Sequence, residues 1–118
     1  MTNVPKENLI GKVLRNLRQE GRYTQKQFAD LLGISRSFLS ELETGEKNPS
    51  VQLLHKISET FKIPPAILYL RAIDEDHIPE EHKEEILDKI SSFAREMDEY
   101  FNISENLHNA KQEHLSEA

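Results

Sequence analysis

Apolar side chains in the first 71 residues recur at the spacing of α-helices. One helix face, at positions i, i+3, i+4 and i+7, is formed by Ile10, Val13, Leu14 and Leu17. Gly21 follows and can end that helix in a left-handed turn. No alternating apolar and polar run of useful length for a strand interrupts the pattern. The pattern therefore predicts an all-α protein.

A second helix is predicted to begin at Gln25. Thr24 and Gln27 have the spacing of a capping box, in which each side chain accepts a hydrogen bond from a free backbone amide. The helix is short, because Gly33 supplies a turn that a side chain would strain. Ser35 can then cap a third helix. Two helices joined by such a tight turn form the arrangement that offers one helix to the DNA major groove.

The segment TQKQFADLLGISRSFLSELETGEKNPS resembles the helix-turn-helix of the phage repressor and Cro family, often called the XRE family. The resemblance covers roughly residues 10–70. It rests on an ordered set of residues: Thr24-Gln25, Phe28-Ala29, Gly33-Ile34-Ser35, Leu39, Leu42-Glu43, Gly45 and Asn48-Pro49-Ser50. The resemblance implies a five-helix DNA-binding domain over residues 1–71, with its motif at about 25–44. It also implies a sequence-specific transcriptional regulator of double-stranded DNA.

The resemblance implies a DNA phosphate contact for Gln25, and the free amides and positive dipole of a helix N-terminus favour the same role. The outward face of the third helix should meet base edges, since arginine can pair with guanine and glutamate can accept from cytosine. The expected DNA-binding residues are Thr24, Gln25, Lys26, Arg36, Ser37, Ser40, Glu41, Lys47 and Asn48. The alternatives are that Gln25 only helps to cap its helix and that the lysines are simply solvated.

Glu43 requires a separate explanation, because a carboxylate beside DNA is unfavourable unless it is neutralised. In the family, a glutamate at the matching place pairs with an arginine of the first helix, which here would be Arg18. The resemblance therefore implies a structural ion pair, in which Arg18 can still turn one donor toward a phosphate.

Charge divides the chain into two parts. The formal net charge is -6, but residues 1–71 hold 11 Lys and Arg against 7 Asp and Glu, whereas residues 72–118 hold 4 against 14. The basic part can meet phosphate while the acidic part stays away from the duplex. We interpret residues 72–79 as a linker, 80–107 as a C-terminal amphipathic helix for dimerisation, and 108–118 as a polar tail that is frayed or disordered.

A heptad-like seam runs along the C-terminal segment in steps of 4, 3, 4 and 3, through Ile86, Ile90, Phe93, Met97 and Tyr100. Ile103 and Leu107 continue it less regularly. The seam can fold back on the first domain or pair with a second chain. We favour a homodimer, because a five-helix domain of this family closes its own core. The alternative is an antitoxin-like or other regulatory interaction module whose C-terminal helix binds a partner protein.

Composition argues against several other classes of protein. The chain has no cysteine for a disulfide or a thiolate zinc site, and its five histidines lack metal-binding spacing. No nucleophile has a paired base, and no apolar run approaches the roughly 20 residues of a membrane helix. We expect a cytoplasmic protein without enzymatic activity, cofactor or metal. Its predicted role is that of a dimeric repressor acting on an operator near its own gene.

Overall fold

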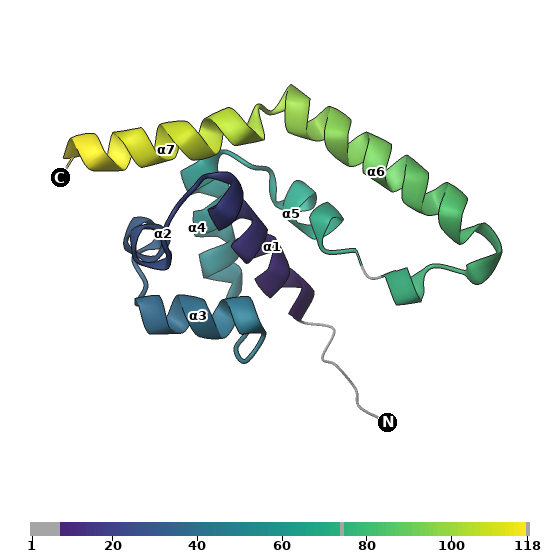
Figure 1. Ribbon diagram of the computed structural model, residues 1–118, viewed down its shortest axis with the longest axis horizontal. Helices are drawn as coiled ribbons and strands as arrows, with labels where there is room; N and C mark the ends of the chain where they lie inside the picture. The colour runs from purple at the N-terminus through teal and green to yellow at the C-terminus, as the bar shows by residue number, and fades with distance from the viewer. Residues whose placement is uncertain (1–7, 74, 118) are drawn as a thin grey trace.

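The computed structural model describes residues 8–73 and 75–117 of the chain, and every regular element in these ranges is a helix (Figure 1). The predicted all-α class is confirmed. The helices are α1 (Asn8–Glu20), α2 (Gln25–Leu32), α3 (Arg36–Thr44), α4 (Val51–Phe61), α5 (Pro65–Arg71), α6 (Lys83–Tyr100) and α7 (Ile103–Glu117). Two short 3-10 turns, η1 (Glu75–His77) and η2 (Glu80–His82), connect α5 to α6.

Local chemistry sets the bounds of α2 and α3. The Thr24 hydroxyl accepts from the Gln27 amide at 3.0 Å, and the Gln27 side chain accepts from the Thr24 amide at 3.0 Å, so both bonds of the capping box are present. Gly33 ends α2 with a φ of 71°, a left-handed conformation that glycine adopts without strain. Ser35 then caps α3 by accepting from the Phe38 amide at 3.0 Å.

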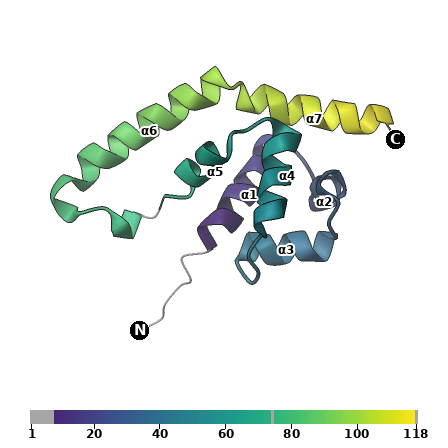
Figure 2. The same ribbon diagram turned by 180° about the vertical axis from the view of Figure 1, so that it is seen from behind.

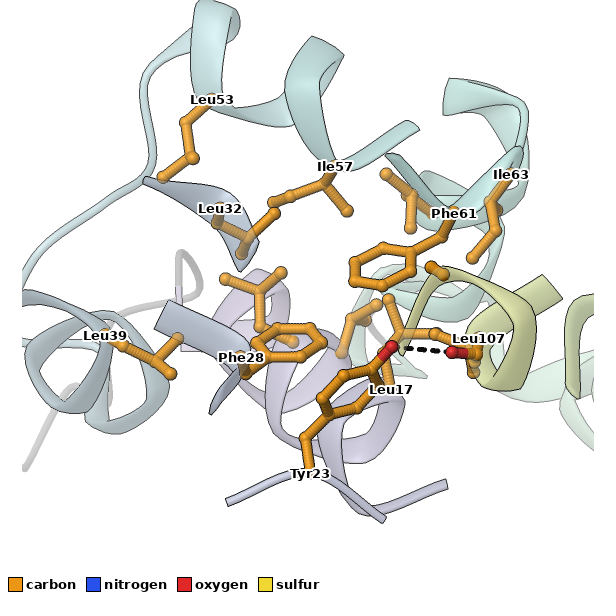
Figure 3. Packing of buried hydrophobic residues seen from close by; sticks show 14 of the residues in the cluster. Leu17, Tyr23, Phe28, Leu32, Leu39, Leu53, Ile57, Phe61, Ile63 and Leu107 are labelled. Carbon is orange, nitrogen blue, oxygen red and sulfur yellow. Dashed lines mark hydrogen bonds between the residues drawn. The ribbon is translucent and has the colours of Figure 1, made fainter. Parts of the chain in front are cut away.

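Aromatic residues form the centre of the core. The Phe28 and Phe61 rings stack with their centroids 5.3 Å apart, and the Tyr23 ring meets both rings edge-on (Figure 3). Buried aliphatic side chains from α1, α3 and α4 surround them, among them Leu17, Leu39 and Ile57. The close view in Figure 3 also shows Leu107 of α7 beside Tyr23. A helix far along the sequence therefore contributes to the core of the helix-turn-helix domain.

The C-terminal part holds two long helices where the sequence interpretation expected one. The helix is interrupted at Asn102, whose φ of 52° is left-handed. The Asn106 side chain donates a hydrogen bond to the Phe101 carbonyl at 2.8 Å. Beyond the break, α7 lies across α1 and α4, on the end of the domain away from α3 (Figures 1 and 2). Its stripe of Ile103, Leu107 and Ala110 is buried against the domain.

Three expectations about this region were therefore wrong. Ile103 and Leu107 do not continue the seam of α6, because the break at Asn102 turns their face onto the first domain. The boundary expected between residues 107 and 108 lies inside α7, and the segment expected to be frayed is helical to Glu117. The five N-terminal helices also do not close the core alone, since Ile103 and Leu107 are fully buried in it.

Helix α6 lies at the edge of the molecule and has no buried residue. Its C-terminal half is fixed by Arg71, whose guanidinium lies 3.2 Å from the Glu20 carboxylate and 3.0 Å from the Asp98 carboxylate. Among the helices of residues 8–73 and 75–117, none combines the length and the hydropathy of a membrane-spanning segment.

The five predicted dimerisation residues all lie on α6 and keep part of their surface exposed. Met97 packs partly against the core, and Ile86 and Ile90 are half-buried. Phe93 and Tyr100 are 48% and 76% exposed. The face of α6 thus presents apolar surface that this single chain does not cover.

Candidate nucleic-acid interface

The beginning of α2 and the outward face of α3 line one open hollow of about 390 Å³. Its walls are Gln25, Arg36, Ser37, Ser40 and Glu41, which are five of the nine predicted DNA-binding residues. Gln25 lies on α2 and the other four residues lie on α3, beyond the tight turn at Gly33. That turn changes the direction of the chain, so that all five side chains line the same space. The hollow is polar and open, unlike an enclosed apolar site for a small molecule.

The other four predicted residues are exposed but are not among the residues that line this hollow. Thr24 caps α2, and Asn48 lies in the loop before α4. Lys26 is exposed and pairs with Asp30 at 3.1 Å, while Lys47 lies 3.6 Å from the Glu41 carboxylate. Both lysines therefore have acidic neighbours in the free chain. A phosphate would have to compete with those carboxylates for the two ammonium groups.

A buried ion pair adjoins the hollow through Gln25, which lines the hollow and donates to the carboxylate of the pair. Arg18 of α1 donates from Nε to Glu43 Oε2 at 2.7 Å and from Nη2 to Glu43 Oε1 at 3.0 Å. The Glu43 side chain is only 1% exposed, so this bidentate contact compensates a carboxylate that has lost its water. The third donor of Arg18, Nη1, points to the Tyr23 carbonyl at 3.2 Å. Arg18 thus ties α1, α3 and the turn before α2 together.

Two further side chains converge on the same carboxylate. Gln25 Nε2 donates to Glu43 Oε1 at 3.3 Å, and Arg15 Nε lies 3.9 Å from the same oxygen. The Arg15 side chain is 54% exposed, so part of it lies at the surface. Arg15 was not among the predicted DNA-binding residues, and the hydrogen bond between Gln25 and Glu43 was not predicted. Arg15 and Arg18 are three residues apart on α1, which places them on one helix face and was the available signal.

The described residues contain no group of three or more His, Asp or Glu side chains placed to hold a metal ion. The chemistry that this region offers is hydrogen bonding and charge, from arginine, lysine, amide and hydroxyl groups. These are the groups with which proteins contact DNA phosphates and base edges.

Comparisons with known proteins agree with this geometry. A helix-turn-helix family model matches residues 14–68, from α1 to α5. The chain is 28% identical over 101 residues to an uncharacterized HTH-type transcriptional regulator of Mycobacterium tuberculosis, covering 73% of this chain and 72% of that protein.

Two further relatives have names that state a role. The HTH-type transcriptional repressor RghR of Bacillus subtilis is 32% identical over 90 residues, covering 71% of this chain and 67% of RghR. The antitoxin PezA of Streptococcus pneumoniae is 35% identical over 68 residues, covering 58% of this chain but only 40% of PezA. The matched segment, the capped α2–α3 pair and these relatives together show that the chain belongs to the XRE-type helix-turn-helix family of DNA-binding transcriptional regulators.

Proposed function

We propose that the chain is a dimeric repressor that binds an operator near its own gene. The observation that carries the proposal is the shared hollow of Gln25 and the α3 face, with a neutralised Glu43 adjoining it through Gln25. The similarity to RghR, whose name describes a repressor, supports repression over activation. Repression would follow from occupying the DNA that RNA polymerase needs.

In this proposal the beginning of α2 binds the DNA backbone. The first turn of a helix leaves backbone amides without intrahelical partners. The Thr24 hydroxyl accepts a hydrogen bond from one of them, the Gln27 amide. The amides of Gln25 and Lys26 are then available to a phosphate oxygen, with the Gln25 side chain oriented by Glu43. Arg15, Lys26, Lys47 and Asn48 would supply further backbone contacts. Such contacts fix the position of the protein and make the affinity fall with salt.

The outward face of α3 would read the sequence. Arg36 and Ser37 are exposed, and Ser40 and Glu41 are half-buried at the wall of the hollow. Arg36 has the geometry to donate two hydrogen bonds to one guanine, a pairing that discriminates by about 1–3 kcal/mol against other bases. Glu41 would accept from a cytosine amino group once Lys47 turns to a phosphate.

The apolar face of α6 would pair with the same face of a second copy. One recognition helix reads few bases, whereas two related by a two-fold axis read two half-sites about one DNA turn apart. Phe93 and Tyr100 are the most exposed large apolar side chains of α6, and α6 lies away from α3 (Figure 1). Pairing through α6 would therefore leave both DNA-binding faces free.

A second candidate function uses the same face of α6 for a different protein. The similarity to the antitoxin PezA favours an antitoxin-like chain, in which α6 would bind a partner protein. The two candidates differ in the oligomeric state of the isolated chain. Sedimentation equilibrium that gives a dimer favours the repressor proposal, and a monomer at all concentrations favours the antitoxin-like one.

Selection from a random duplex pool tests the DNA-binding role. We expect the wild-type chain to enrich a two-fold symmetric site and Arg36→Ala to lose preference at one base pair of each half-site. His108→Ala, on the exposed side of α7, is the control and should enrich the wild-type site. Enrichment of the same site by Arg36→Ala would refute the role of Arg36, and no enrichment by wild type would refute sequence-specific binding.

A further inference from the structure

The α1–α2 turn, residues 21–23, lies immediately before the Thr24 cap of α2, and α7 reaches it from the C-terminal end of the chain. The Tyr23 hydroxyl donates to the Leu107 carbonyl at 2.6 Å, the bond drawn in Figure 3. The Lys111 ammonium donates to the Arg22 carbonyl at 2.9 Å and lies 5.3 Å from the centroid of the Tyr23 ring. Two side-chain contacts thus link residues more than eighty positions apart.

The conformation of this turn depends on its surroundings. Arg22 has a φ of 58°, a left-handed conformation that residues other than glycine keep only when neighbouring contacts hold them there. The approach of α7 is close, because a Cβ on Gly21 would lie 3.3 Å from the Leu107 Cβ and 2.6 Å from the Tyr23 ring. The contacts from α7 are therefore among those that keep the turn in its observed shape.

Hydrogen bonds also connect the α1–α2 turn to the DNA-binding hollow. The Tyr23 carbonyl accepts from Arg18 Nη1 at 3.2 Å, and the same guanidinium holds Glu43. Glu43 accepts from the Gln25 side chain. Lys111 and Gln25 are thus connected by a continuous series of hydrogen bonds and adjacent residues, and none of these contacts needs DNA to form.

We infer that Tyr23 and Lys111 are positioning residues for DNA binding, through which α7 holds the α1–α2 turn and thereby fixes Gln25 at the DNA surface. This inference rests on the proposed function, and it adds a control point outside the DNA-binding face. A protein that drew α7 away from the domain would loosen the beginning of α2 and lower the affinity for DNA. It would do so without contacting the recognition helix.

The test compares Lys111→Ala with Lys89→Ala in the full chain. Both changes remove one positive charge from the acidic C-terminal part, but Lys89 is exposed on α6 and pairs there with Glu85. Thermal unfolding first identifies a temperature at which both variants are folded. Fluorescence anisotropy then gives the Kd for the duplex that the wild-type chain selects, at two salt concentrations. Amide hydrogen exchange of residues 24–28 is measured on the same samples.

We expect Lys111→Ala to bind about fivefold more weakly than Lys89→Ala, the effect of losing one exposed hydrogen bond of typical net strength. The salt dependence should be equal in the two variants, because neither change removes a phosphate contact. Exchange of the amides at the beginning of α2 should be faster in Lys111→Ala only. Tyr23→Phe, which removes one hydroxyl and keeps the ring, should shift affinity and exchange in the same direction.

Equal affinity of the two lysine variants, with wild type binding normally, would overturn the inference and leave the proposed function standing. Unchanged exchange at residues 24–28 would overturn it as well, even if the affinity fell. A wild-type chain that bound no duplex would instead refute the proposed function, and the inference with it. Lower stability alone, without a change in Kd at the chosen temperature, would show that α7 serves only the fold.

Discussion

Replacing Leu107 by alanine tests whether α7 is a true part of the domain core. The side chain is fully buried and lies beside Tyr23, on a helix that the N-terminal domain would not need if it closed its own core. Removing a buried leucine in this way costs about 2–5 kcal/mol, depending on how far the cavity collapses. Because Leu107 is fully buried, we expect a loss near the middle of that range, about 3 kcal/mol.

The matched control is Leu87→Ala, which makes the same chemical change on α6. Leu87 is only half-buried, so its loss should lower the free energy of unfolding by about 1 kcal/mol or less. Urea unfolding followed by circular dichroism at 222 nm gives both values, and an unchanged m-value would show that the folded and unfolded states stay comparable. If Leu107→Ala were no less stable than Leu87→Ala, the packing of α7 on the domain would be refuted.

Three further changes follow from the same contacts. Arg18→Ala should destabilise the chain by about 3 kcal/mol, the lower end of the cost of an uncompensated buried carboxylate, because Arg15 and a glutamine remain near Glu43; urea unfolding that gave the wild-type value would contradict the ion pair. Burial raises the pKa of the Tyr23 phenol to about 12, so its contribution to stability is complete below pH 10 and is lost as the pH rises to about 12. The absorbance at 295 nm of wild type minus that of Tyr23→Phe should therefore titrate near pH 12, and a midpoint near 10 would argue against burial of the phenol. Phe93→Glu should convert the proposed dimer to monomers in sedimentation equilibrium without changing the circular dichroism spectrum, whereas a dimer of unchanged strength would place the interface elsewhere.

The elements that could be predicted from the sequence are those whose structure depends on residues close together in the chain. The caps of α2 and α3 form hydrogen bonds to residues no more than four positions away. The bounds set by Thr24, Gly33 and Ser35 could therefore be predicted from the sequence. The pairing of Arg18 with Glu43 was available only through the family resemblance, since the two residues are 25 positions apart. The contacts of Arg15 and Gln25 with Glu43 add a geometry that neither spacing nor resemblance described.

The C-terminal part shows the limit of periodicity. Ile103 and Leu107 have the same four-residue step as the seam of α6, and nothing in that step distinguishes a continued seam from a new helix facing elsewhere. The difference is made by the left-handed backbone at Asn102 and by the partner surface around Tyr23. Asparagine adopts the left-handed conformation more readily than most residues, so Asn102 was a local signal of a helix end, whereas the partner surface depends on tertiary packing.

The measurement that tests the central claim most directly is an anisotropy titration of the full chain. The chain is titrated against the duplex upstream of its own gene and against a scrambled duplex, each at two salt concentrations. We predict tighter binding to the upstream duplex, with an affinity that falls steeply as salt rises because several phosphate contacts release counterions. Equal and weak binding to both duplexes would contradict the proposal that this chain is a repressor of its own gene.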